Sequence, residues 1–282
     1  MIYFLLLLMV TAVWGWTFVL VKDAVTQYPT LPFLQIRFAL ALVVMVLLVR
    51  RLPTRRELRI GAIVGTVLAG GYLTQTAGLN YTSPGNAGLI TGMFVVFTPL
   101  LNRIFGARIR WWTWGATAIS LGGLVMLTGG PAGMGLGDLL VLASAVLFAL
   151  HIVLLGRWSP GLPAAPLAMV QMGASALIFS AGGTWQLRPP SSSVWFAIVI
   201  TGVFASAFGF YIQTWSQGFI SANRTALILA TEPAWALAAS VVLAGQRLGL
   251  LQAAGAALVL AAIVGHELAS LKFEVHHDPS RP

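Results

Sequence analysis

The chain has 282 residues, of which 58% are hydrophobic and only 8% are charged, and its mean hydropathy is +0.89. Soluble domains carry roughly 25% charged residues, so this composition excludes a soluble enzyme and predicts an all-α membrane protein. The formal charge of +9 does not indicate nucleic-acid binding, because the cations stand in short segments between apolar spans and no soluble basic face displays them. The absence of cysteine excludes disulfides, thiolate catalysis and cysteine metal sites.

Ten apolar segments follow one another along the chain. A helix that rises about 1.5 Å per residue needs roughly 20 apolar residues to cross a hydrocarbon core about 30 Å thick. On that measure the predicted spans are 2–21, 31–50, 58–79, 83–103, 111–128, 137–156, 163–182, 193–218, 221–245 and 250–268. Turn and breaker residues separate these spans, and the connectors between them are too short to hold a soluble domain.

The second half of the chain repeats the first. Gln75-Thr76 is followed by Asn80-Tyr81-Thr82-Ser83, and Gln213-Thr214 is followed at the same spacing by Gly218-Phe219-Ile220-Ser221. Each copy holds an odd number of spans, so the second copy must insert upside down relative to the first. Inverted repeats are a recurrent transporter architecture. We therefore predict ten transmembrane helices in two inverted five-helix repeats around a central cavity, with boundaries 1–130, 131–270 and a cytoplasmic tail, 271–282.

The positions of Lys and Arg predict how the chain is oriented. Only Lys22, Arg188 and Arg247 fall on one side of the membrane, and Arg37 falls within the second span. The other twelve of the 16 cations share the side of the N-terminus: Arg50, Arg51, Arg55, Arg56, Arg59, Arg103, Arg108, Arg110, Arg157, Arg224, Lys272 and Arg281. Because cytoplasmic loops are enriched in Lys and Arg, both termini are predicted to lie in the cytoplasm, with the chain in the inner (plasma) membrane.

Ionisable residues inside spans are costly and mark solute or ion pathways. Glu232 lies eleven residues past Ser221, about 16 Å into the ninth span and near the midplane. It is expected to bind a substrate amine or carry a coupling proton, unless it is structural and pairs with Arg37. Arg37 is the natural partner for a substrate carboxylate. His151, which aligns with Thr17 of the first span, suits either a proton relay or a helix contact.

Glutamines occur as matched pairs in the two halves, Gln35 with Gln171 and Gln75 with Gln213. They predict either an amide-lined path for a polar solute or hydrogen bonds that fix the helix bundle. Deep aromatic residues predict cavity walls or stacking surfaces. The candidate substrate-binding residues are therefore Trp14, Thr17, Arg37, Tyr72, Gln75, His151, Gln171, Tyr211, Gln213, Glu232 and Trp235.

Small residues recur every four positions in two spans. Such stripes let helix backbones approach closely in a membrane, so we expect helix contacts along both of them. The stripes are Gly61, Gly65 and Ala69 in the third span, and Ala253, Ala257, Ala261 and Gly265 in the tenth.

Several motifs resemble one family. They are Ala77-Gly-Leu-Asn-Tyr-Thr-Ser-Pro-Gly-Asn-Ala-Gly-Leu-Ile90, Trp14-Gly-Trp-Thr-Phe18, Gly137-Asp-Leu-Leu, Thr231-Glu-Pro233 and Gly245-Gln-Arg-Leu248. In order and position they resemble the EamA branch of the drug/metabolite transporter superfamily, over residues 1 to 268. The resemblance implies export or exchange of amino acids, nucleotide-sugars, sugar phosphates or drugs. The chain departs from the family where Ala107 and Gln246 replace a frequent Glu.

The sequence thus predicts a secondary transporter that exports or exchanges small metabolites, foremost amino acids, by alternating access. Its partners are the solute and the lipid bilayer, it is expected to act as a monomer, and no catalytic residue, metal or cofactor is predicted. One alternative is an aspartyl protease, because Gly135-Leu136-Gly137-Asp138 matches a GxGD pattern and Asp23 lies on the same side; that chemistry needs two carboxylates sharing a proton. Carriers of nucleotide-sugars, sugar phosphates or drugs, and a non-transporting scaffold or receptor, are the others.

Overall fold

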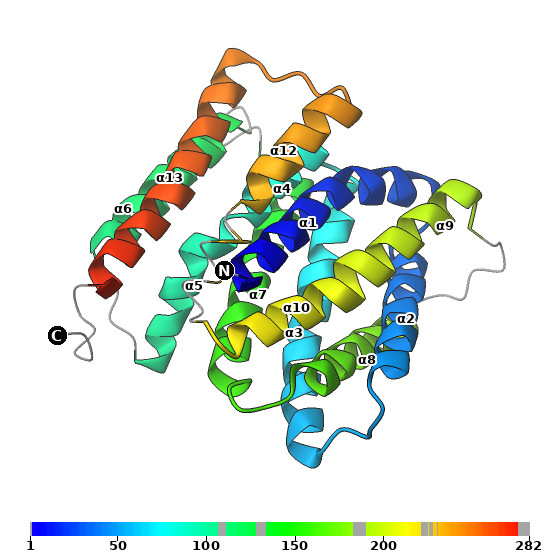
Figure 1. Cartoon of the computed structure of the whole chain (residues 1–282). Coiled ribbons are helices and arrows are strands. Elements are labelled where there is room, and N and C mark those ends of the chain that lie inside the picture. The colour runs from blue at the N-terminus through cyan, green and yellow to red at the C-terminus, as the bar shows by residue number, and fades with distance from the viewer. Residues whose placement is uncertain are drawn as a thin grey trace.

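The computed structural model describes residues 2–106, 111–127, 134–182, 190–220, 225, 228–229 and 231–275, and within these ranges all regular structure is helical. Figure 1 shows the helices as one bundle. Several cations used in the charge count lie outside the described residues, namely Arg108, Arg110, Arg188, Arg224 and Arg281. The tail beyond Val275 and most of the segment 221–230 also lie outside them.

The described helices follow the predicted spans. In the first half they are α1 (Ile2–Gln27), α2 (Thr30–Leu48), α3 (Arg55–Leu79), α4 (Pro84–Thr91), α5 (Phe94–Asn102), the 3₁₀ turn η1 (Arg103–Phe105) and α6 (Trp111–Leu127). In the second half they are α7 (Leu136–Trp158), α8 (Ala164–Gly182), α9 (Ser192–Val199), the π-helix η3 (Ile200–Phe208), α10 (Gly209–Gln217), α12 (Glu232–Leu243) and α13 (Leu250–Val275). Among the described residues, seven stretches are long and apolar enough to cross a membrane.

Three spans depart from a regular α-helix. The fourth is split into α4 and α5, where Met93, Val95 and Val96 donate to carbonyls three residues back, at 3.1, 3.2 and 2.9 Å. The eighth is continuous but winds as a π-helix through η3, a form that occurs mostly at functional sites. The ninth turns at Thr231 before α12 begins at Glu232. Broken helices at the repeat interface are typical of transporters.

The packing follows an internal twofold relationship. α3 packs against α7, and correspondingly α1 packs against the η3 and α10 parts of the eighth span. α1 packs against α12, and correspondingly α4 and α5 pack against α7. Three further contacts join helices that are each other's counterparts, α2 with α8, α4 with α12, and α6 with α13. Figure 1 shows α6 and α13 side by side at one edge of the bundle. The molecule is therefore an interlocked pair of inverted repeats rather than two separate domains.

The glycine stripe of the third span makes the close contact that the sequence predicts. A methyl group added at Gly61 would lie 2.6 Å from Val170 Cβ, and one at Gly65 would lie 2.8 Å from Gln171 Cα. The alanine stripe of the tenth span does not make such a contact, because Ala253, Ala257 and Ala261 are exposed. α13 instead turns a neighbouring face to α6: a methyl group at Gly123 would lie 2.9 Å from Gly255 O and 2.8 Å from Val259 Cγ2. Small residues are spread around this helix, so spacing alone did not select its packing face.

The N-terminus of α3 carries a capping box and an ion pair. Thr54 N–H donates to Glu57 Oε2 at 2.7 Å, Glu57 N–H donates to Thr54 Oγ1 at 3.3 Å, and Arg51 donates to both carboxylate oxygens of Glu57 at 2.6 and 3.0 Å. These bonds satisfy two free backbone donors of the first turn and hold the preceding loop against the helix. The neighbouring carboxylate raises the pKa of Arg51.

Candidate functional site

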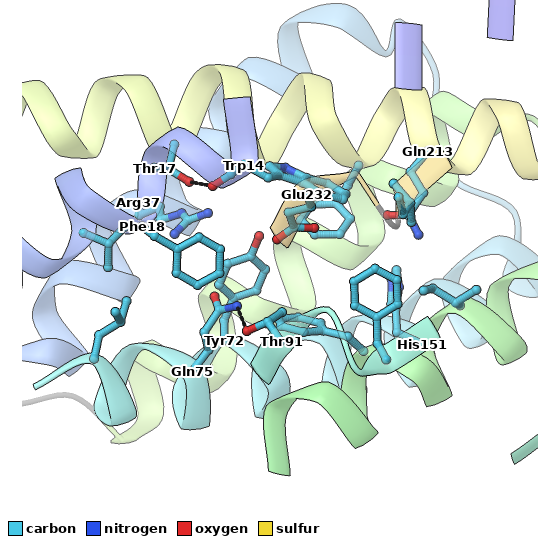
Figure 2. Close-up of a pocket in the computed structure, with 17 residues that line it drawn as sticks. Trp14, Thr17, Phe18, Arg37, Tyr72, Gln75, Thr91, His151, Gln213 and Glu232 are labelled. Atoms are coloured by element: carbon cyan, nitrogen blue, oxygen red, sulfur yellow. Dashed lines mark hydrogen bonds between the residues drawn. The ribbon is translucent and has the colours of Figure 1, made fainter. Parts of the chain in front are cut away.

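A cavity lies between the two repeats and is lined from both. The volume open to water within it is about 50 Å³, enough for a few water molecules. Its walls come from the first four spans and from α7, the eighth span and α12. The lining residues are Trp14, Thr17, Phe18, Val21, Arg37, Tyr72, Gln75, Leu79, Thr91, Phe94, Phe148, His151, Ile152, Phe210, Gln213, Leu229 and Glu232. Figure 2 shows their side chains gathered around one space.

Glu232 supplies the only carboxylate among the described lining residues. It stands in the first turn of α12, and it is 6% exposed. Its side chain points into the cavity in Figure 2, and within the described ranges it makes no hydrogen bond or ion pair. The dipole of α12 favours a negative charge at this N-terminal position, although Pro233 has no N–H and Ala234 and Trp235 donate theirs to the Thr231 carbonyl. A buried acid held in this way is free to meet a cationic group of a solute.

Arg37 supplies the permanent positive charge of the cavity. It is 2% exposed on α2, its Nε–H donates to Ser206 Oγ of η3 at 3.0 Å, and its guanidinium lies over the Tyr72 ring at 4.5 Å from the centroid. A cation over an aromatic face is attracted by the ring quadrupole. Arg37 is not paired with Glu232: in the part of the chain that is described, the one ion pair is Arg51 with Glu57. The sequence-based alternative of a structural Arg37–Glu232 pair is therefore wrong.

The amide pair Gln75 and Gln213 lines the cavity from both repeats. Gln75 Nε2 donates to Thr91 Oγ1 at 3.1 Å. Gln213 Nε2 donates to Gln217 Oε1 at 3.1 Å, and Gln217 Nε2 donates to the Ile152 carbonyl at 3.2 Å. Each bond ties the amide to a neighbour and leaves part of its hydrogen-bonding capacity facing the cavity. The two amides thus hold the bundle together and also present polar groups to a solute.

His151 is held from behind by Gln171. The two side chains form a buried hydrogen bond of 2.9 Å between His151 Nε2 and Gln171 Oε1, and Gln171 Nε2 donates to Thr214 Oγ1 at 3.2 Å. The edge of the His151 ring meets Phe210 at a centroid distance of 5.6 Å. His151 lines the cavity, whereas Gln171 stands one layer behind it.

Aromatic rings form much of the wall. Trp14 packs against Phe210 at 5.2 Å, and Tyr72 contacts Phe148 at 5.3 Å and Phe210 at 5.8 Å between ring centroids. The Trp14 indole N–H donates to the Ala205 carbonyl in η3 at 2.7 Å, and Thr17 Oγ1 donates to the Trp14 carbonyl at 2.7 Å. The π-helix η3 thus accepts hydrogen bonds from two side chains of the site. Trp14 donates to a backbone carbonyl of η3, and Arg37 donates to the Ser206 hydroxyl.

Three of the candidate residues do not line the cavity. Gln171 is fully buried behind His151, and Tyr211 is partly buried against the apolar core. Trp235 is 44% exposed: its Cβ packs on Gly15 of α1, 2.5 Å from where a methyl group there would lie, but the side chain does not line the cavity. Depth in the membrane was predicted from the sequence for all three, but the direction in which each side chain points depends on how its helix is rotated.

Apolar lining residues were missed because they carry no polar signal. Most lie one helical turn from a predicted residue: Phe18 follows Trp14, Val21 follows Thr17, Leu79 follows Gln75, Phe148 precedes His151 and Phe210 precedes Gln213. Residues three and four apart share a helix face. Extending each polar position by one turn would therefore have found these neighbours.

The two aspartates of the protease alternative have other roles. Asp138 caps α7, with Oδ2 accepting from Gly135 N–H at 3.2 Å and Oδ1 accepting from Thr82 Oγ1 at 2.6 Å. Asp23 is exposed and lines a separate groove between α1 and the start of α9, together with Gln27 and Ser193. Asp138 is thus occupied by capping and Asp23 belongs to another surface, so they do not form a shared-proton dyad.

Comparison with known proteins settles the family. Residues 1–129 and 135–266 each match the EamA-like transporter family. The chain belongs to this family. It is a multi-pass membrane transporter for a small solute, and this is not a family of enzymes.

Relatives of this EamA-like transporter extend over most of its length. An uncharacterized transporter of Archaeoglobus fulgidus is 28% identical over 266 residues, which are 92% of this chain and 83% of the relative. The uncharacterized inner membrane transporter YedA of Escherichia coli K12 is 29% identical over 206 residues, 69% of this chain and 67% of YedA. A protein of known crystal structure shares the fold with a TM-score of 0.70 at 20% identity, covering 95% of this chain and 98% of that one.

Proposed function

We propose that this transporter exports or exchanges small zwitterionic metabolites, foremost amino acids, by alternating access across the inner membrane. One observation carries the proposal: Arg37 and Glu232 both line the cavity and, among the described residues, form no ion pair with each other. A buried charge without a partner is costly, so opposite charges kept apart favour a ligand that supplies both missing partners. An α-amino acid does so with its carboxylate and its ammonium group.

The charge of the cavity favours this class over the other carriers. Phosphate recognition usually employs several cations or a helix N-terminus directed at the phosphate. Here one permanent cation lines the described part of the cavity, and the helix N-terminus of α12 carries an acid. Sugar phosphates and nucleotide-sugars therefore rank below amino acids.

A set of hydrogen bonds between the two repeats is a candidate for the contact that closes one side of the cavity during alternating access. Gly85 N–H donates to Ser240 Oγ at 3.1 Å and to Gln246 Oε1 at 3.3 Å, Gln246 Nε2 donates to Asn86 Oδ1 at 3.5 Å, and Ser240 is hydrogen-bonded to Gln246. We call these four residues the inter-repeat clasp. With both termini in the cytoplasm, as the cation distribution favours, the clasp lies on the outer side. Gln246 can accept from Gly85 and donate to Asn86 at once, which a glutamate carboxylate cannot do.

Transport by purified protein in liposomes tests the proposal. Liposomes loaded with one amino acid are given a labelled amino acid outside, and exchange is measured for the free amino acid, its N-acetyl derivative and its carboxamide. We expect exchange of the free amino acid only, because each derivative removes one of the two charges. Transport of all three forms at equal rates would contradict recognition by Arg37 and Glu232. We propose action as a monomer, with repeats 1–130 and 131–270, so exchange should persist at one protein per liposome.

A further inference from the structure

A buried chain of hydrogen bonds runs from the cavity into the bundle. It joins His151 on α7, Gln171 on α8 and Thr214 on α10, which are 1%, 0% and 2% exposed. His151 Nε2 meets Gln171 Oε1 at 2.9 Å, and Gln171 Nε2 donates to Thr214 Oγ1 at 3.2 Å and to the Leu167 carbonyl at 3.4 Å. Three helices thus determine how one imidazole ring is held.

These hydrogen bonds determine which imidazole nitrogen of His151 carries the proton. The Leu167 carbonyl can only accept, so the amide NH₂ of Gln171 must face it, and the amide oxygen is left for His151. An amide oxygen also only accepts, so His151 Nε2 carries the proton. In the neutral ring Nδ1 is then an unprotonated acceptor.

His151 Nδ1 is open to the cavity. It has no hydrogen-bond partner among the described residues. In the described ranges, the side-chain atoms that lack a partner and are also fully enclosed are the hydroxyls of Thr76, Ser120, Ser159 and Ser216. His151 Nδ1 is not among them, so it is accessible from the cavity. The charged and titratable groups that line the same space are Arg37, Tyr72 and Glu232. Figure 2 places Arg37 and His151 toward opposite ends of this space, with Glu232 between them.

We propose that His151 Nδ1 is a fixed hydrogen-bond acceptor that selects solutes bearing a neutral donor, a hydroxyl or N–H, at the end away from Arg37. This rests on the proposed function, in which Arg37 binds the carboxylate and Glu232 the ammonium group of an amino acid. A side chain with a donor satisfies Nδ1, whereas an isosteric apolar side chain displaces water from it and leaves it unpaired. Sites with such unpaired groups reject the analogue that lacks the donor. Gln171, which touches no solute, acts as a positioning residue.

The tautomer is measurable because the chain has few histidines. Substituting His266, His276 and His277 with Gln leaves His151 as the only one of four, and ¹⁵N labelling of histidine then reports both ring nitrogens. We expect a protonated Nε2 and an unprotonated Nδ1 at neutral pH. Gln171→Met should remove this bias and populate both tautomers. Ser175→Ala, which deletes a buried bond to the Gly65 carbonyl one turn along the same helix, should leave the spectrum unchanged.

Selectivity is measured with threonine and valine, which differ by a hydroxyl in place of a methyl group. Wild-type protein in liposomes should exchange threonine with about tenfold higher kcat/KM than valine, and threonine should shift the Nδ1 resonance more than valine does. His151→Phe, which keeps a ring in place, and Gln171→Met should both bring the threonine-to-valine ratio toward one. Ser175→Ala should keep the ratio.

Specific results would overturn the proposal. A protonated Nδ1 in the wild type at neutral pH would refute the acceptor, and so would a threonine-to-valine ratio that His151→Phe leaves intact. If neither amino acid is exchanged, the proposed function fails and the selectivity with it, while the spectrum still decides the tautomer. Exchange of both at equal rates would keep the proposed function and refute the selection.

Discussion

At the residue scale, Glu232 is a buried carboxylate that faces a cavity without a cationic partner among the described residues. If it binds the substrate amine, Glu232→Gln should weaken exchange of zwitterions by roughly a hundredfold, because losing one partner of a buried charge pair costs about 3 kcal/mol or more. The melting temperature should stay constant or rise, since the variant removes an unpaired buried acid. Exchange kinetics and thermal unfolding check both expectations.

Glu57→Gln is the matched control, because Glu57 is also buried but is paired with Arg51 away from the cavity. It should lower stability and leave solute affinity unchanged. A coupling role for Glu232 predicts another pattern: Glu232→Gln would abolish accumulation driven by a pH gradient and leave exchange intact. Unchanged affinity together with unchanged accumulation would refute both roles.

The glutamines Gln75 and Gln213 give a second prediction at this scale. Each makes one side-chain bond and faces the cavity, so Gln75→Ala and Gln213→Ala should each weaken solute binding by about 1 kcal/mol, the typical net value of a hydrogen bond. Binding measured by tryptophan fluorescence or by exchange kinetics would show this as roughly a fivefold loss. Equal binding by the wild type and both variants would make these amides purely structural.

At the scale of elements, α4 packs against α12, and we expect this contact to hold one side of the cavity closed. Gly88 packs directly on Ala236, so that a methyl group at Gly88 would overlap the Ala236 side chain. Gly88→Ala should push the two helices apart, weaken the inter-repeat clasp and shift the population toward the state open on that side. A single cysteine at Thr91, which lines the cavity, should then react faster with an impermeant thiol reagent in intact cells.

Gly115→Ala is the control for this experiment, because nothing lies within 4 Å of an added methyl group at Gly115 on α6. It should leave the reactivity of the cysteine at Thr91 unchanged. If Gly88→Ala does not raise that reactivity either, the α4–α12 contact does not form the closed side.

At the scale of the whole molecule, the cation distribution predicts the orientation in the membrane. The chain has no cysteine, so single cysteines can be introduced without a background. Cysteines replacing Arg55, Arg108 and Arg157 should be protected from an impermeant reagent in intact cells, and one replacing Ser192 should react. Labelling at Arg55 from outside would contradict the cytoplasmic N-terminus and reverse the side to which the clasp is assigned.

The sequence by itself determined the class and the number of repeats, and it singled out most of the polar residues that line the cavity. Hydropathy predicts a membrane span wherever about 20 consecutive apolar residues occur, because inside the membrane their backbone N–H and C=O groups can be hydrogen-bonded only within a helix. Matched polar residues reveal the repeat. Gln75, Gln213, Arg37 and Glu232 could be found in this way because ionisable and amide groups inside a membrane are costly and therefore conspicuous.

Only the tertiary structure decided which way each helix turns and where the helices break. Trp235 lies outside the cavity and Gln171 lies behind His151 because rotation about a helix axis is fixed by side-chain packing between helices, and almost every face of these helices is apolar. The π-helix at Ile200–Phe208, which receives Trp14 and Arg37, is likewise invisible in local sequence. Arg37 and Glu232 line the cavity from α2 and α12 without forming an ion pair, because the packing of their helices decides where each side chain lies.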